Sequence, residues 1–353
     1  MYSRSIIVLD VSFCRLNGVL HELPSSVTTV RPLQVLNISS NELTAEFPSS
    51  TWNVMQSLVV LNASNNSFTG HIPPSLCLSP SLAMLDLCYN QLSGSVPAAL
   101  GNCSTLKVLK VGNNKLSGII PVELFHATSL ENLSLPNNGL QGELDGGNIV
   151  KLSNLVTLDL GWNKLNGKIP RSIGQLQRLE ELYLSSNNMF GELPSTLSNC
   201  TRLIIIDLMI NNISGDLGRV NFSTLHNLKH VDLMRNNFSG IVPESIYSCS
   251  NLTALRLSMN HLHGEISPRI GNLHLSFLSL ARNSFTNITE AFHVFKSFRN
   301  ITTLILAQNF MNEAMPQDET IDSFQNLQYI NMADSSLTGN YQFGYRSSEI
   351  WRY

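Results

Sequence analysis

The stretch Leu85-Asp-Leu87-Cys-Tyr-Asn90-Gln-Leu92 decides the fold, because its pattern returns along most of the chain. Leu158-Asp-Leu160-Gly-Trp-Asn163-Lys-Leu165 repeats it, with an asparagine again three residues after the second leucine. The eleven gaps between successive asparagines of this kind run from 23 to 26 residues, and six of them are 24. Such a period indicates an array of stacked units rather than one globular core. The asparagines are Asn41, Asn66, Asn90, Asn114, Asn138, Asn163, Asn187, Asn211, Asn236, Asn260, Asn283 and Asn309.

This phrase, at a period of 20–29 residues, is typical of leucine-rich repeats. Its alternation predicts one short strand per unit, and stacking would align these strands into a parallel sheet on a concave side. Each asparagine amide would bond backbone groups that the next turn leaves unpaired, which predicts a structural asparagine ladder. We therefore predict an α/β repeat solenoid of about fourteen turns. It would span residues 1–339, with complete ladder turns over about 33–325 and a non-repeat tail at 340–353.

A second phrase, Gly-x-apolar-Pro, follows the ladder in six repeats, for example Gly94-Ser-Val-Pro97. Glycine permits a backbone conformation closed to other residues, and proline stops sheet pairing. We expect a short second strand and then a helical or 3₁₀ turn on the convex side. The repeats with Gly142, Gly215 and Gly264 lack the proline, so their second strands should be weaker.

Composition argues against several classes of function. Charged residues make up only 13% of the chain and the net charge is −3, which does not favour a nucleic-acid partner or an anionic membrane. No apolar run is long enough for a membrane helix, and residues 1–10 lack the apolar run of a secretory leader, so we expect no direct membrane insertion by this sequence. Nucleotide loops, catalytic dyads and metal-ligand spacings are absent, so we predict no enzyme, cofactor or metal.

Ligand contacts are expected among the side chains between and just after the strand leucines on the concave side. Aromatic and Arg side chains dominate binding hot spots. The alternative is a solvated face of ordinary repeat consensus. A sulfated peptide would favour Arg or Lys opposite its anion, and this face is mixed in sign. The candidate contacts are Asp159, Trp162, Tyr183, Asp207, Asp232, Arg235 and Arg256.

Twelve Asn-x-Ser/Thr sequons are candidate N-glycosylation sites, provided that the chain is secreted. The alternative is repeat consensus, which produces two of them, Asn212 and Asn237, without any glycan. The twelve are Asn37, Asn62, Asn65, Asn102, Asn132, Asn199, Asn212, Asn221, Asn237, Asn251, Asn287 and Asn300.

Cysteines show no zinc spacing. Cys103, Cys200 and Cys249 share one register, which predicts small buried residues stacked along the convex side. For Cys77 and Cys88 the alternative to free thiols is a disulfide across neighbouring turns.

Longer stretches carry a family resemblance. Gly-x-Ile-Pro with a 24-residue period is similar to the plant extracellular repeat subtype. Arg31-Pro-Leu-Gln-Val-Leu-Asn-Ile-Ser-Ser-Asn41 and Leu61-Asn-Ala-Ser-Asn-Asn-Ser-Phe-Thr-Gly70 resemble the tyrosine-sulfated glycopeptide and phytosulfokine receptors among plant receptor kinases. The resemblance implies a plasma-membrane or extracellular receptor ectodomain that reads a secreted peptide and docks a co-receptor. It covers roughly residues 5–339, and the leader, hormone-binding island, membrane helix and kinase of that family are not found in the sequence.

The resulting prediction is a protein- or peptide-recognition module that resembles part of such a receptor. Two alternatives stay open: a truncated gene product without independent function, and a secreted binding protein similar to the polygalacturonase inhibitors. We also expect the first and last turns to expose apolar faces, so that the chain aggregates or is retained when it is expressed alone.

Overall fold

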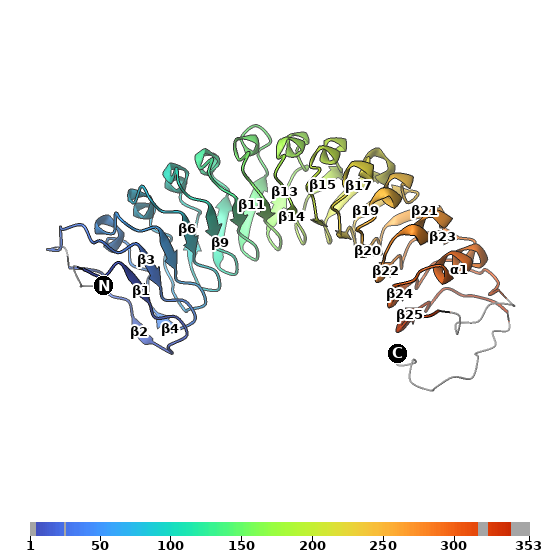
Figure 1. The fold of residues 1–353 in the computed structure, drawn as a ribbon, viewed down its shortest axis with the longest axis horizontal. Coiled ribbons are helices and arrows are strands. Elements are labelled where there is room, and N and C mark those ends of the chain that lie inside the picture. The colour runs from blue at the N-terminus through green and yellow to red at the C-terminus, as the bar shows by residue number, and fades with distance from the viewer. Residues whose placement is uncertain (1–4, 25, 317–323, 340–353) are drawn as a thin grey trace. The chain divides into compact units, whose positions relative to one another are not determined.

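The computed structural model describes residues 5–24, 26–316 and 324–339. The predicted tail at 340–353 lies outside this described part of the chain. The structure divides into two compact units, residues 1–188 and 189–353, and each unit is described by itself (Figure 1).

The first unit is built on short parallel strands that recur once per repeat, paired in register with their middle leucine or other apolar residue side by side. The middle residue is buried in all but the first strand, while its two neighbours are half-buried, as the alternation in the sequence predicts. These inner strands are β1 (Val8–Asp10), β3 (Val35–Asn37), β5 (Val60–Asn62), β6 (Met84–Asp86), β8 (Val108–Lys110), β10 (Asn132–Ser134), β12 (Thr157–Asp159) and β14 (Glu181–Tyr183).

The second unit repeats this construction with the same parallel register. Together the two runs of inner strands confirm the predicted leucine-rich-repeat class with a parallel sheet. The inner strands of the second unit are β16 (Ile205–Asp207), β18 (His230–Asp232), β20 (Ala254–Arg256), β22 (Phe277–Ser279), β24 (Thr303–Ile305) and β25 (Tyr329–Asn331).

A second set of parallel strands follows the ladder asparagines. In the first unit they are β2 (Asn17–Val19), β4 (Glu42–Thr44), β7 (Ser93–Gly94), β9 (Lys115–Ile119), β11 (Gly139–Glu143) and β13 (Lys164–Asn166). In the second unit they are β15 (Phe190–Glu192), β17 (Asn212–Asp216), β19 (Asn237–Gly240), β21 (His261–Glu265) and β23 (Ser284–Thr286).

The prediction that proline-free repeats have weaker second strands is wrong. β11, β17 and β21, which contain Gly142, Gly215 and Gly264, each run for five residues, as long as any other. The proline lies beyond the strand, where Pro97 and its counterparts cap the next 3₁₀ turn, so its absence removes no strand pairing. Glycine itself is required: at Gly167 φ is +78° and a Cβ would lie 2.6 Å from Glu143 Cγ of the preceding repeat.

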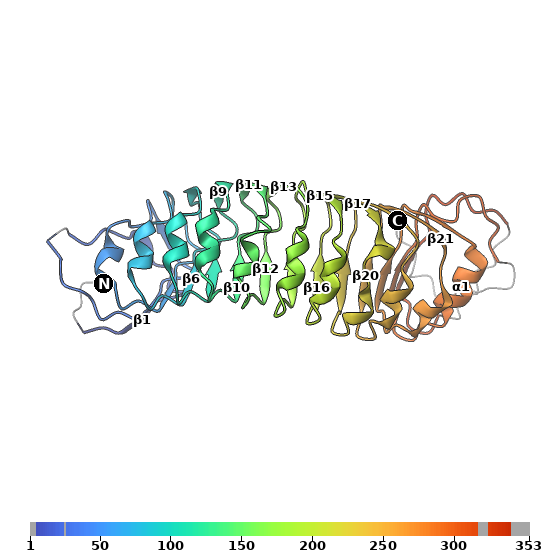
Figure 2. The same cartoon turned by 90° about the horizontal axis from the view of Figure 1, so that it is seen from above.

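Short helical turns cover the side opposite the inner strands, here called the back face (Figures 1 and 2). The first unit has the 3₁₀ turns η1 (Thr51–Val54), η2 (Pro74–Leu78), η3 (Ala98–Asn102), η4 (Val122–His126), η5 (Ile149–Lys151) and η6 (Arg171–Gln175). The second has η7 (Ser195–Asn199), η8 (Leu217–Arg219), η9 (Phe222–Thr224), η10 (Glu244–Ser248), η11 (Pro268–Asn272) and the α-helix α1 (Ile288–Lys296).

Columns of leucine fill the interior between the inner strands and the back face, and most of them are fully buried. The ladder asparagines close this core on one side. Asn260 illustrates the bonding: its Nδ2 donates to the carbonyls of Leu233 (2.9 Å) and Leu257 (3.0 Å), and its Oδ1 accepts from the N–H of Phe238 (3.0 Å). In all twelve, Oδ1 accepts from an N–H of the preceding turn. Buried backbone groups at each turn are thereby satisfied.

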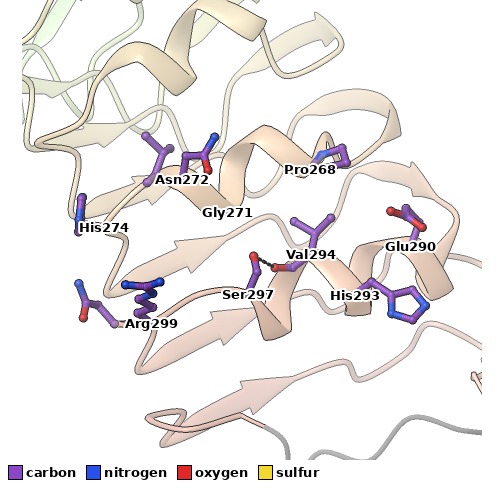
Figure 3. Close-up of a pocket in the computed structure, with 11 residues that line it drawn as sticks. Pro268, Gly271, Asn272, His274, Glu290, His293, Val294, Ser297 and Arg299 are labelled. Atoms are coloured by element: carbon purple, nitrogen blue, oxygen red, sulfur yellow. Dashed lines mark hydrogen bonds between the residues drawn. The ribbon is translucent and has the colours of Figure 1, made fainter.

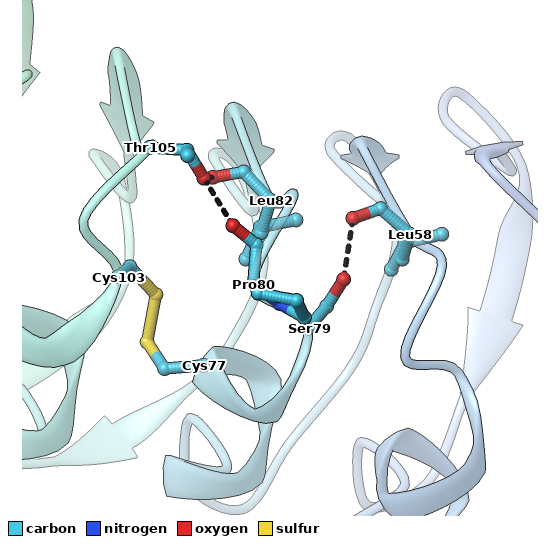
Figure 4. Close-up of a disulfide and its surroundings, with 7 residues drawn as sticks. All are labelled: Leu58, Cys77, Ser79, Pro80, Leu82, Cys103 and Thr105. Carbon is cyan, nitrogen blue, oxygen red and sulfur yellow. Dashed lines mark hydrogen bonds between the residues drawn. A yellow bond between two sulfur atoms is a disulfide. The ribbon is translucent and has the colours of Figure 1, made fainter.

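The cysteine expectation needs correction at two positions. Cys77 is bonded to Cys103, not to Cys88, across the neighbouring turns η2 and η3, where their Cα atoms are 5.0 Å apart (Figure 4). Cys88 lies instead after β6, with its N–H donated to Asp86. The two cysteines are 26 residues apart, two more than the 24-residue step between these turns, so Cys77 within η2 meets the residue that ends η3. Cys200 and Cys249 are fully buried, as predicted, and neither forms a disulfide.

Apolar side chains are exposed on the first turn. Phe13 is 81% exposed, and Leu16 is 41% exposed although its counterpart in the next turn, Leu43, is buried. Across the described residues, no helix has the length and apolar character needed to span a bilayer.

Candidate functional site

The candidate contact residues occupy two kinds of position on the face of the inner strands, which we call the sheet face. The strand-end position is the third residue of each inner strand, such as Asp159 or Asp232. The left-handed position is the residue just before each ladder asparagine, such as Trp162 or Arg235, and it has φ near +55° in both cases. The two positions differ in the backbone strain that they impose and in the groups that their side chains contact.

Strand-end Asp and Asn side chains have a structural role that the sequence analysis missed. In each of them Oδ1 accepts the N–H of the residue two positions on, which ends the strand in an Asx turn. Asp159 accepts from Gly161 (3.2 Å), and Asp232 from Met234 (3.0 Å). The same bond is formed by Asp10, Asn37, Asn62, Asp86, Asp207 and Asn331. In the aspartates, Oδ2 is the oxygen that takes no part in this turn.

In the second unit the pairing register brings three candidates together. Asp207, Asp232 and Arg256 are consecutive partners on β16, β18 and β20. Arg256 Nη1 lies 2.8 Å from Asp232 Oδ2, and its guanidinium carbon lies 5.5 Å from the centre of the Phe277 ring. The arrangement holds a planar cation in place between a carboxylate and an aromatic face.

Burial is the main cause that raises the pKa of Asp232 above its ordinary value, and the nearby charge of Asp207 adds to the rise. The N–H of Met234 and the guanidinium of Arg256 act in the opposite direction. The carboxylate of Asp232 therefore depends on Arg256 for its charge balance, and removing Arg256 should raise the pKa further.

The left-handed position is unfavourable for most L-residues, by about 1–2 kcal/mol each, and Asn tolerates it best. Asn113 and Asn137 occupy it in the first unit. Tyr89, Trp162 and Arg235 occupy it too, and the first two are 60% and 55% exposed. Side chains that gain little from burial at a strained position are candidates for selection by function rather than by stability.

In the first unit, Asp159 on β12 and Tyr183 on β14 are register partners. Ser134 Oγ, on the other side, lies 3.2 Å from Asp159 Oδ2. Trp162 belongs to the same repeat as Asp159, so the first unit places a carboxylate, a phenol and an indole on adjoining repeats of its sheet face.

Sequence reasoning overlooked the residue that precedes the buried middle residue of each strand. Phe277, which packs under Arg256, is one of these. It also overlooked a group of half-buried methionines beside the second-unit cluster, Met209, Met234 and Met259. Unbranched thioether side chains adapt to irregular partners. The signal was available, because the three methionines lie within the repeat phrase and Phe277 directly precedes it.

The sequons are distributed over different surfaces. Asn37, Asn62 and Asn132 lie within the inner strands, and the Nδ2 of Asn37 already donates to Asp10 (3.0 Å). A glycan there would cover the sheet face. Asn212 and Asn237 begin the second strands β17 and β19. Exposed sequons on the back-face turns or just after them are Asn102, Asn199, Asn221, Asn251 and Asn300, while Asn65 is exposed at a left-handed position and Asn287 caps α1.

Comparison with known proteins places this geometry in a family. A family profile described as "Leucine rich repeat" matches residues 80–140, 142–189 and 195–262, and a second profile of that description matches 32–54 and 57–78. The chain belongs to the leucine-rich-repeat proteins.

Two Arabidopsis thaliana proteins are similar over short stretches. Receptor-like protein 3 is 41% identical over 77 residues, which are 21% of this chain and 10% of that protein. Phytosulfokine receptor 1 is 38% identical over 66 residues, which are 19% of this chain and 6% of that protein. The matches therefore span a small part of each relative.

Two structures of plant receptors are similar over almost the whole chain. The plant peptide hormone receptor RGFR1, in complex with RGF2, is 27% identical with a TM-score of 0.80, covering 94% of this chain and 55% of RGFR1. The Arabidopsis receptor kinase HAESA, in complex with the peptide hormone IDA and the co-receptor SERK1, is 29% identical with a TM-score of 0.78, covering 94% of this chain and 59% of HAESA. The chain thus resembles plant leucine-rich-repeat receptor ectodomains and spans a little over half of their length.

Proposed function

We propose that this chain is the peptide-recognising part of a plant cell-surface receptor and has a binding rather than an enzymatic role. Its ligand would be a small secreted peptide bound in extended form along the sheet face, and a co-receptor ectodomain would be the second partner. The observation that carries the proposal is the held guanidinium of Arg256, paired with Asp232 and placed over Phe277 beside a group of methionines. Arg and aromatic groups of this kind dominate binding hot spots.

The disulfide supports an extracellular location. Cys77 and Cys103 join two adjacent back-face turns, and structural disulfides persist in oxidising compartments. Sequons exposed on the back face agree with passage through the secretory pathway. A cytosolic location would leave both features without a use.

The class of peptide is the finer part of the proposal. The likeness to phytosulfokine receptor 1 favours a tyrosine-sulfated peptide. A sulfate would be met by exposed arginines at left-handed positions, Arg235 and Arg282, because Arg256 is already paired with Asp232. The carboxylates of Asp207 and Asp232, in the same unit as these arginines, oppose an anion, so a peptide that combines a sulfate with a basic residue fits this part of the sheet face best.

The test is a calorimetric titration of the secreted chain with a tyrosine-sulfated peptide and with the same peptide lacking sulfate. Replacing Arg256 by Gln should weaken binding by about tenfold or more, the cost of more than 1 kcal/mol expected of a hot spot. The matched control is Arg269→Gln on η11, since Arg269 forms a similar ion pair with Glu244 (2.9 Å) on the back face. Equal loss in both variants, or no binding of either peptide, contradicts the proposal.

A further inference from the structure

The second unit has a groove on its back face that the proposed function leaves unused. The groove lies between η11 and α1 and has a volume of about 560 Å³ (Figure 3). This is within the range of ~300–1,000 Å³ found for sites that enclose drug-sized ligands. It is on the face opposite the sheet face and contains none of the candidate peptide contacts.

Close packing of the two helical turns forms the floor of the groove. A Cβ on Gly271 would collide with Ser297 Oγ, so glycine is needed for α1 to approach η11. Ser297 Oγ donates to the carbonyl of Val294 (2.6 Å), which holds the serine against the helix. The floor is therefore set by the packing of Gly271 against Ser297 at the end of α1.

The walls are polar. His274, Arg299 and Asn272 lie toward one end, and Glu290 and His293 toward the other (Figure 3). His274 Nδ1 lies 3.2 Å from the carbonyl oxygen of Ser250, to which it donates, so Nε2 is the ring nitrogen left for a ligand. Guanidinium, imidazole, amide and carboxylate groups together offer both donors and acceptors, which is the chemistry that recognises sugar hydroxyl and acetamido groups.

One lining residue is itself a sequon. Asn300 lines the groove, is exposed, and is followed by Ile301 and Thr302. Any glycan attached to its Nδ2 begins at the groove. Because attachment makes the contact intramolecular, with an effective concentration in the millimolar range, weak hydrogen bonds are enough to keep a sugar in place.

We propose that Asn300 carries an N-linked glycan whose first two N-acetylglucosamine residues lie in this groove and bridge η11 to α1. The inference rests on the proposed function only in requiring a secreted chain. The glycan would tie α1 to the repeat before it, in addition to the contact between Gly271 and Ser297.

The test uses the full chain secreted from plant cells behind a heterologous leader. Glycopeptide mass spectrometry should find Asn300 occupied. Amide hydrogen exchange across Ile288–Lys296 should be faster in Asn300→Gln than in the unchanged chain by about fivefold, the low end of typical coupling between sites. Asn102→Gln, an exposed back-face sequon in the first unit, is the matched control and should leave α1 unchanged.

A second variant distinguishes the presence of the glycan from its binding in the groove. Arg299→Ala keeps the sequon, so the glycan remains while a groove wall is lost, and exchange in α1 should again be faster. Unoccupied Asn300 beside occupied back-face sequons overturns this inference and leaves the proposed function standing. Occupied Asn300 with unchanged exchange in both groove variants also overturns it. No occupancy at any sequon overturns this inference as well, and the proposed function is then decided by its own calorimetric titration.

Discussion

Replacing Arg235 by Asn should stabilise the chain while removing a proposed ligand contact. Arg235 has φ of +55°, where an L-residue costs about 1–2 kcal/mol and Asn considerably less. Its side chain is exposed and forms no ion pair with any other described residue. Little packing is lost, so we expect a net gain of about 0.5–1 kcal/mol in the free energy of unfolding.

Arg235→Gln is the control, because it removes the same charge but keeps the backbone penalty. Urea unfolding of the two variants should differ by about 0.5–1 kcal/mol in favour of Asn, corresponding to about 1–3 °C in Tm. Both variants should weaken binding of a sulfated peptide by a similar factor, since both lack the guanidinium. Equal stability of the Asn and Gln variants would refute the view that this position is kept for function at the expense of stability.

Three further predictions concern the scaffold. In Asn260→Ala, the N–H of Phe238 and the carbonyls of Leu233 and Leu257 lose the side chain that bonds them in a buried site. The substitution should therefore lower the free energy of unfolding by about 3 kcal/mol, measured by urea titration. The second prediction concerns Glu22. Partial burial raises the pKa of its carboxyl, but the N–H groups of Ser50 and Ser49 and the nearby hydroxyls lower it more, to about 2. Its stabilisation, about 1 kcal/mol after solvent screening, should therefore be complete above about pH 4.5 and be lost as the pH falls toward 2, a loss that is absent in Glu22→Gln. Serine at both Cys77 and Cys103 should cost about 3–4 kcal/mol in non-reducing buffer and nothing in reducing buffer, because the bond closes a loop with a sequence separation of 26 residues.

The repeat class, the inner strands and the 3₁₀ turns were predictable from sequence, because a fixed period forces each side chain into one register. Leu109 and Leu158 are buried for this reason alone. The proline rule failed because it made the second strand depend on a residue that lies after it; Pro97 follows β7 and caps η3. Each repeat position must be assigned residue by residue, because the proline that caps the next 3₁₀ turn lies only two positions after the end of a second strand such as β9.

The candidate site was only partly predictable. The alternation places Asp232 on the sheet face, but nothing in one sequence shows that its Oδ1 is already used by Met234. The Cys77–Cys103 bond required knowing that consecutive back-face turns bring their Cα atoms within disulfide range. The groove beside α1 depends on packing between Gly271 and Ser297, which no periodicity describes.

Self-association is a related property that the structure makes measurable. Phe13 and Leu16 are exposed on the first turn. Replacing Phe13 by Lys should lower the apparent mass in sedimentation at micromolar concentration, because it reduces the apolar area available for stacking. A chain that is monodisperse before the substitution would contradict the expectation of aggregation.

The central claim is that a peptide binds along the sheet face, and protection of that face by a bound peptide tests it most directly. Hydrogen exchange of the secreted chain should be measured with and without a saturating tyrosine-sulfated peptide. The account predicts slower exchange in the second-unit segments that carry Arg235 and Arg256, and no change in η11. Protection confined to the back face, or absent throughout while binding is measurable by calorimetry, would contradict it.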